Sequence, residues 1–119
     1  MRIVNIDTFI KLPAGILFAK YEPHIFEDLM IKGNTDNNDF SSVRLLEVKA
    51  GSLDEMVDIL ESARVGSSFK LDLEYYCRDG AFEKDQLFAV YEKEDVEQLL
   101  ETIHRCLKIA YIDRTIDIK

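Results

Sequence analysis

An arginine, an aspartate, a glycine and an aromatic ring stand together in the short segment from Arg78 to Phe82. A guanidinium can clamp a phosphate through two hydrogen bonds, a carboxylate can accept from ribose hydroxyls, and an aromatic ring can stack on a base. Arg78, Asp79 and Phe82 therefore have the chemistry of a small nucleotide pocket. The same residues also suit a plain hairpin turn, in which Gly80 supplies a positive φ and Phe82 covers the core.

Two more arginines, Arg105 and Arg114, are candidates for phosphate contacts near the end of the last expected helix. A solvated helix terminus is the simpler explanation, because cations stabilise that end of the helix dipole. The net charge of −8 argues against duplex nucleic acid and anionic membranes as partners, since affinity for such polyanions comes largely from basic groups. An anionic ligand is therefore expected to be small.

Acidic residues around the same turn raise the question of a metal or a general acid. Asp79, Glu83 and Asp85 offer oxygen ligands, but their spacing fits no calcium loop, and acids in turns commonly bond the local backbone. The histidines occur singly, with His24 expected to be solvated and His104 to be packed beside an apolar stripe. The sequence has no phosphate-binding glycine loop, zinc-spaced cysteine pair or nucleophile elbow. We therefore expect binding without catalysis, metal or cofactor.

The strands that would position this turn are predicted from alternating or short apolar runs bounded by turn residues. Strands are expected at residues 16–21, 25–32, 43–48, 69–78 and 86–91. The last two are expected to pair antiparallel around the turn, and residues 33–39 are expected to form a loop.

Helices are predicted where capping residues precede apolar positions at helical spacing. Asp7 is expected to cap a short turn that Pro13 ends. Ser52 with Glu55 forms a capping box for a helix ending near Val65, and a long helix is expected beyond Glu92 with Asp95 and Gln98 as its start signal. The sequence predicts an α+β fold: a small antiparallel β-sheet with the two main helices packed on one face.

Length and composition are typical of one domain, residues 1–119, with 47% hydrophobic and 32% charged residues. Cys77 and Cys106 fall in apolar patterns, where a free thiol behaves as a small hydrophobe. Asp7 interrupts the opening apolar residues that a signal peptide would need, and no apolar run approaches the ~20 residues of a membrane span. The sequence predicts a cytoplasmic protein with no membrane partner.

Two segments and the opening of the chain resemble small phage and prophage proteins. The segments are Arg78 to Phe82 and Asp85 to Glu97, and the opening has Leu12-Pro13 and Gly15 ahead of Tyr21-Glu22-Pro23 and Phe26. Together they cover less than half of the chain. The group that they most resemble is the phage anti-Thoeris sponge family, whose members sequester the cyclic ADP-ribose signal made by host TIR-domain defence proteins.

The resemblance implies a small α+β homo-oligomer, a dimer or larger ring, in the host cell cytoplasm. It also implies that a small cyclic nucleotide is bound without being cleaved, and some relatives bind cyclic oligonucleotide signals. Phe82 is implied as the ring that stacks on the base, accompanied by Arg78 and Asp79.

Two other classes of function stay open. One is an acidic protein-interaction module that occupies a basic site on a host protein, which the charge of −8 favours through electrostatic steering. The other is a small enzyme that uses the turn between Asp79 and Asp85.

Overall fold

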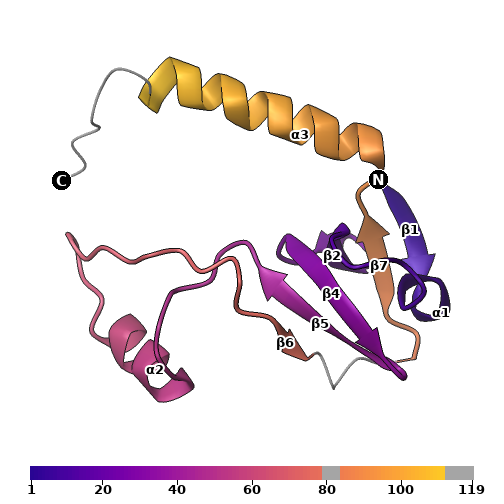
Figure 1. Ribbon diagram of the computed structural model, residues 1–119, viewed down its shortest axis with the longest axis horizontal. Coiled ribbons are helices and arrows are strands. Elements are labelled where there is room, and N and C mark those ends of the chain that lie inside the picture. Colours follow the sequence, from indigo (N-terminus) through magenta and orange to yellow (C-terminus); the bar gives the residue numbers. More distant parts are fainter. Residues whose placement is uncertain (79–83, 112–119) are drawn as a thin grey trace.

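The computed structural model describes residues 1–78 and 84–111 of the chain (Figure 1). One antiparallel sheet of seven strands dominates it, and the expected α+β class is confirmed. The strands are β1 (Arg2–Asn5), β2 (Leu17–Glu22), β3 (Ile25–Phe26), β4 (Met30–Asp36), β5 (Asp39–Arg44), β6 (Cys77–Arg78) and β7 (Leu87–Val90). Their order across the sheet is β1-β7-β2-β4-β5-β6, with β3 paired to β2.

Three α-helices accompany the sheet: α1 (Ile6–Phe9), α2 (Leu53–Glu61) and α3 (Lys93–Cys106), which continues into a π-helical segment, η1 (Leu107–Tyr111). Among the described residues, no helix is both long enough and apolar enough to span a membrane.

Four phenylalanines from distant parts of the chain form the centre of the core. Phe9 of α1 stacks on Phe88 of β7 with ring centroids 4.0 Å apart and planes within 6°. Phe18 of β2 and Phe40 of β5 meet Phe9 at 4.6 and 5.0 Å, in tilted and edge-on geometries. All four rings are at most 1% exposed. Aromatic pairs in such geometries add about 0.5–1.5 kcal/mol each beyond the area that they bury, so this cluster ties α1 to three strands.

The first helix is capped by a different residue from the one expected. The Asn5 side chain accepts from the backbone N–H of Thr8 at 2.9 Å, so Asn5 is the cap and Asp7 lies inside the first turn. The residues before it, for which no strand was predicted, form β1, which pairs with β7 from Arg2↔Val90 to Asn5↔Leu87. The helix is short, but it carries Phe9 into the core.

The strands at 16–21 and 86–91 are confirmed as β2 and β7, while the middle of the sheet differs from expectation. The expected strand 25–32 divides into β3 and β4, and the expected strand 43–48 is shifted to β5. The expected loop 33–39 is a β4–β5 hairpin that turns at Asn37, whose φ of 56° asparagine tolerates better than most residues.

The predicted strand 69–78 is wrong for most of its length. Only Leu71, bridged to Val48, and the two residues of β6 are in strand pairing, and β6 pairs with β5 instead of β7. Both edges of β7 are already occupied, by β1 and β2, so the segment has no place beside it. The alternating apolar side chains of this segment stay 42–56% exposed: Phe69, Leu71, Leu73 and Tyr75.

The start of α2 is confirmed and the start of α3 is corrected. Ser52 Oγ accepts from the Glu55 amide at 3.1 Å, although the Glu55 carboxylate bonds the Gly51 amide instead of that of Ser52. The helix ends at Glu61, four residues before the expected Val65. For α3 the cap is Glu92 with Asp95 as its capping-box partner, and not Asp95 with Gln98.

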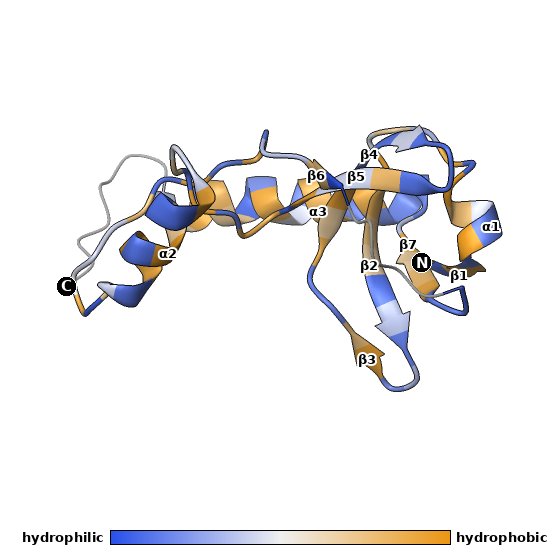
Figure 2. Cartoon of the chain, turned by 90° about the horizontal axis from the view of Figure 1, so that it is seen from below, coloured by the Kyte–Doolittle hydropathy of each residue, from blue (hydrophilic) through white to orange (hydrophobic). Residues whose placement is uncertain are grey.

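The expected packing of both helices on one face of the sheet is not found. Neither α2 nor α3 contains a buried residue. Figure 1 draws α3 along one side of the molecule and α2 on another, and Figure 2 shows α2 lying beyond the sheet. The Cα radius of gyration is 16.8 Å, against about 13.5 Å for a compact domain of this length, so the chain is extended.

Candidate functional site

The structure describes two of the five residues expected at the site. Arg78 ends β6, and Arg105 lies in the last turn of α3. Asp79, Phe82 and Arg114 fall outside the described residues.

Arg78 is held by an acid on the neighbouring strand. Its Nε donates to Asp39 Oδ2 at 3.0 Å. The pairing of β5 with β6 brings the two side chains together, because Arg78 is opposite Ser41 and Asp39 lies two residues before Ser41 on the same strand. The side chain of Asp39 is only 14% exposed, whereas that of Arg78 is 69% exposed. Since this pair uses Nε and leaves most of the side chain in solvent, the guanidinium can still meet an anion.

Arg105 lies elsewhere. Its Nη2 approaches Glu101 Oε1 at 3.4 Å, an exposed pair one turn apart on α3, and such pairs contribute little to stability. Figure 1 places the C-terminal end of α3 well away from β6. The structure therefore does not bring Arg78 and Arg105 into one pocket within this chain, and Arg105 fits its simpler explanation as a solvated cation at the helix terminus.

A pocket of about 410 Å³ lies beside the β4–β5 turn, a volume within the usual range for small-molecule sites. Its described lining residues come from three separate parts of the chain: Ile6, Asp7, Ile10, Asn38 and Lys84. Two of them are aliphatic, and the other three offer a carboxylate, an amide and an ammonium group. The lining can thus combine an apolar contact with a cation and hydrogen-bonding groups.

The pocket adjoins the anchored arginine. Asn38 precedes Asp39, which holds Arg78, so the pocket and the guanidinium share the hairpin end of β4 and β5. Lys84 opens the segment that leads into β7. The sequence patterns did not indicate this pocket, because its residues come from three separate segments. The sequence did indicate one pocket residue, because Lys84 is a cation two positions after the Arg78 to Phe82 turn.

Lys32 supports one wall of the pocket from inside the sheet. Its side chain is 1% exposed, and Nζ donates to the Gly33 carbonyl at 3.1 Å and to Thr35 Oγ1 at 2.8 Å. Thr35 Oγ1 in turn donates to the carbonyl of Ile10, a pocket residue, at 2.6 Å. Burial lowers the pKa of the Lys32 amine, because the charged form loses its hydration. The amine is enclosed and hydrogen-bonded, so it positions Ile10 and does not itself meet a ligand.

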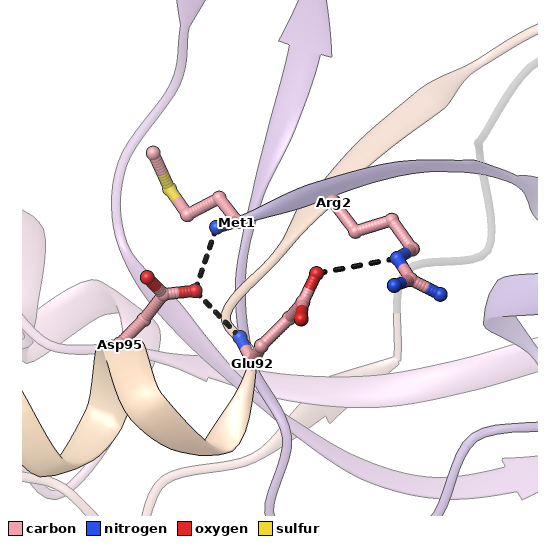
Figure 3. Close-up of polar contacts among 4 residues, drawn as sticks. All are labelled: Met1, Arg2, Glu92 and Asp95. Atoms are coloured by element: carbon pink, nitrogen blue, oxygen red, sulfur yellow. Dashed lines mark hydrogen bonds and ion pairs between the residues drawn. The ribbon is translucent and has the colours of Figure 1, made fainter.

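A second group of charges joins α3 to the sheet (Figure 3). Asp95 Oδ2 lies 2.7 Å from the amine of Met1 and accepts from the Glu92 amide at 2.8 Å, while Arg2 Nε donates to Glu92 Oε1 at 3.2 Å. The Met1 amine, and then the Glu92 amide, lower the pKa of the Asp95 carboxyl. These charges satisfy one another, so they anchor the helix and do not form a reactive site.

Other candidates for chemistry are dispersed. Among the described residues, no group of three side chains of the metal-binding types comes together, and the expected acidic turn includes Asp79 and Glu83, which fall outside them. His104 is exposed on α3 and not packed as expected. Cys77 and Cys106 are free and exposed, so the expectation that they act as small core residues is also corrected.

The pocket beside the β4–β5 turn, with Arg78 next to it, is therefore the candidate site. Its chemistry has to be argued from the chain itself, since no known family model, curated protein or solved structure matches it.

Proposed function

We propose that this protein captures a small anionic nucleotide, of the cyclic ADP-ribose or cyclic oligonucleotide type, and holds it without cleavage in the pocket beside the β4–β5 turn. The observation that carries the proposal is a pocket of ligand size with Lys84 in its wall and the Asp39-anchored Arg78 next to it. The resemblance to phage anti-Thoeris sponges supports the choice of ligand and a role in countering host TIR-domain defence.

Each lining residue has a role in this proposal. The side chains of Ile6 and Ile10 meet the apolar parts of the ligand, and the Lys84 ammonium pairs with a phosphate. Asp7 accepts from ribose hydroxyls, and the Asn38 amide gives directional hydrogen bonds. Arg78 closes on a second phosphate from the neighbouring strand.

Capture does not require a reactive constellation. Of the described lining residues only Asp7 and Lys84 are ionisable, and no histidine or cysteine lies among them. A sponge needs slow release, which charge-assisted hydrogen bonds on a rigid sheet favour.

The direct test is to incubate the purified protein with cyclic ADP-ribose isomers and with cyclic di- and trinucleotides, and to measure binding by calorimetry. The complex is then denatured and the released ligand identified by mass spectrometry. Intact ligand supports capture. Cleaved product would instead assign an enzyme, and absence of binding to every nucleotide would reject the proposal.

Two substitutions locate the site. Lys84→Ala and Arg78→Ala are each expected to weaken nucleotide binding by about tenfold or more, because hydrogen bonds to charged groups contribute roughly 1.5–3 kcal/mol. The matched control is Arg44→Ala. Arg44 also lies on the sheet and pairs with one exposed acid, Asp28, at 2.7 Å, but does not line the pocket. Equal losses in all three variants would show that the effect is general electrostatics and not this pocket.

An acidic protein-interaction module is the second candidate, and a specific observation favours it. Large apolar side chains are 42–68% exposed on α2, on α3 and in the segment 69–76, among them Leu60, Leu73 and Leu100. Phage replication in cells that carry a TIR-domain defence system separates the two functions. Protection that is lost with Lys84→Ala supports capture, whereas protection that survives this change in a protein without nucleotide binding supports the interaction module.

A further inference from the structure

Helix α3 and the start of η1 carry an apolar stripe that the described chain leaves in solvent. Val96, Leu100, Ile103 and Leu107 follow one another at spacings of four, three and four residues, the 3.5-residue repeat of a two-helix seam. Leu100 is 68% exposed, Ile103 56% and Leu107 47%. Figure 2 shows apolar and hydrophilic residues alternating along the helix.

The contact between α3 and the rest of the chain uses another face of the helix. Asp95, Gln98, Leu99 and Thr102 line a cleft of about 260 Å³ together with Met1 and Tyr91. At 3.6 residues per turn, this face lies about a third of a turn away from the apolar stripe. Anchoring through Asp95 therefore does not cover Leu100 or Ile103.

The surface of the chain is 9304 Å², against about 6,600 Å² expected for a compact monomer of 13.8 kDa. The exposed apolar side chains are spread over α2, the segment 69–76 and α3, and the stripe on α3 is one part of this exposed surface.

The charges beside the stripe complement themselves in one orientation. Acids lie in the first part of α3, including Glu97 and Glu101, and bases lie towards its end and in η1, including His104 and Lys108. When two copies run antiparallel with Leu100 opposite Ile103, Glu97 comes next to Lys108 and Glu101 next to His104 of the other copy. A parallel pair would bring acids to acids and bases to bases, which is unfavourable.

We propose that α3 and the start of η1 pair antiparallel with the same segment of a second copy of this chain, through a seam of Val96, Leu100, Ile103 and Leu107. The seam uses none of the pocket residues, so it goes beyond the proposed nucleotide capture and stands independently of it.

The mass in solution tests the seam. Sedimentation of the full chain is expected to give twice 13.8 kDa, and Leu100→Glu is expected to return it to a single 13.8 kDa chain, because a charge would be buried on the seam. The matched control is Leu46→Glu, a leucine that is 73% exposed outside α3 and is expected to leave the dimer intact. A monomeric wild-type chain, or a dimer that Leu100→Glu does not dissociate, would overturn the proposal.

A charge exchange tests the orientation. Lys108→Glu is expected to raise the dimer dissociation constant several-fold, and adding Glu97→Lys in the same chain is expected to restore it. If the effects of the two substitutions on the dimer dissociation constant simply add in the double variant, the antiparallel seam is overturned. Nucleotide binding measured on Leu100→Glu keeps the two proposals distinguishable, because the pocket is expected to remain functional in the monomer.

Discussion

Lys32 places an amine inside a sheet whose central rings are fully buried. Its hydrogen bonds to Gly33 and Thr35 compensate part of the lost hydration, and the Phe9 ring centroid lies 5.9 Å from Nζ. The lost hydration that is not compensated lowers the pKa of the Lys32 amine. One residue therefore links the aromatic cluster, the β4 strand and, through Thr35, the pocket wall at Ile10.

Lys32 is expected to make the free energy of unfolding vary with pH in the alkaline range. The folded chain holds the Lys32 proton less tightly than the unfolded chain, whose pKa is near 10.5, so the free energy of unfolding gains a contribution as pH rises through the folded pKa towards 10.5. Lys32→Met is expected to remove that contribution. Urea denaturation across this range measures it, with Lys11→Met, an exposed lysine, as the control. Identical pH slopes for wild type and Lys32→Met would contradict the role of burial.

At the scale of elements, α3 depends on charges at its first turn more than on packing. Asp95 bonds the Met1 amine and the Glu92 amide, while no residue of the helix is buried. Acidic residues in the first turn of α3 are favourable, because the first turn of a helix presents unpaired N–H groups and a partial positive charge.

The attachment of α3 is accordingly expected to fail in acid. The folded pKa of Asp95 lies below its usual value of 3.8, so its contribution is complete above that pH and is lost as pH falls through the folded pKa. Asp95→Asn should remove this acid-dependent step in helix content, measured by far-ultraviolet circular dichroism. Glu94→Gln, an acid in the same turn, is the control. A step that persists in Asp95→Asn would assign it to another group.

Local elements were predictable where one short segment contains the whole signal. Ser52 with Glu55 predicted the start of α2, and β2 and β7 follow from short apolar runs. The strand prediction for residues 69–78 failed because the alternation of apolar and polar residues shows only which side chains favour burial. It does not show which strand the segment will pair with. The pocket was missed for a related reason, since Asp7, Asn38 and Lys84 meet only after the sheet is assembled.

At the scale of the whole molecule, stability is concentrated at one end. Phe88→Ala is expected to lower the free energy of unfolding by about 3–5 kcal/mol, because it leaves a cavity among four packed rings. Under conditions in which the chain is monomeric, Leu100→Ala should change it by less than about 0.5 kcal/mol, since the side chain is 68% exposed. Chemical denaturation followed by fluorescence of the tyrosines compares the two variants. Comparable losses would mean that α3 belongs to the cooperative unit.

The position of β7 between β1 and β2 has a consequence for how the chain is made. The sheet brings residue 2 beside residue 90, and Phe88 completes the aromatic cluster. A growing chain must therefore have residues 87–90 outside the ribosome before its core can close, and shorter lengths present Phe9, Phe18 and Phe40 without Phe88. Such distant pairings form slowly and leave apolar surface exposed meanwhile. During synthesis these three rings therefore stay exposed until the strand that carries Phe88 has joined the sheet.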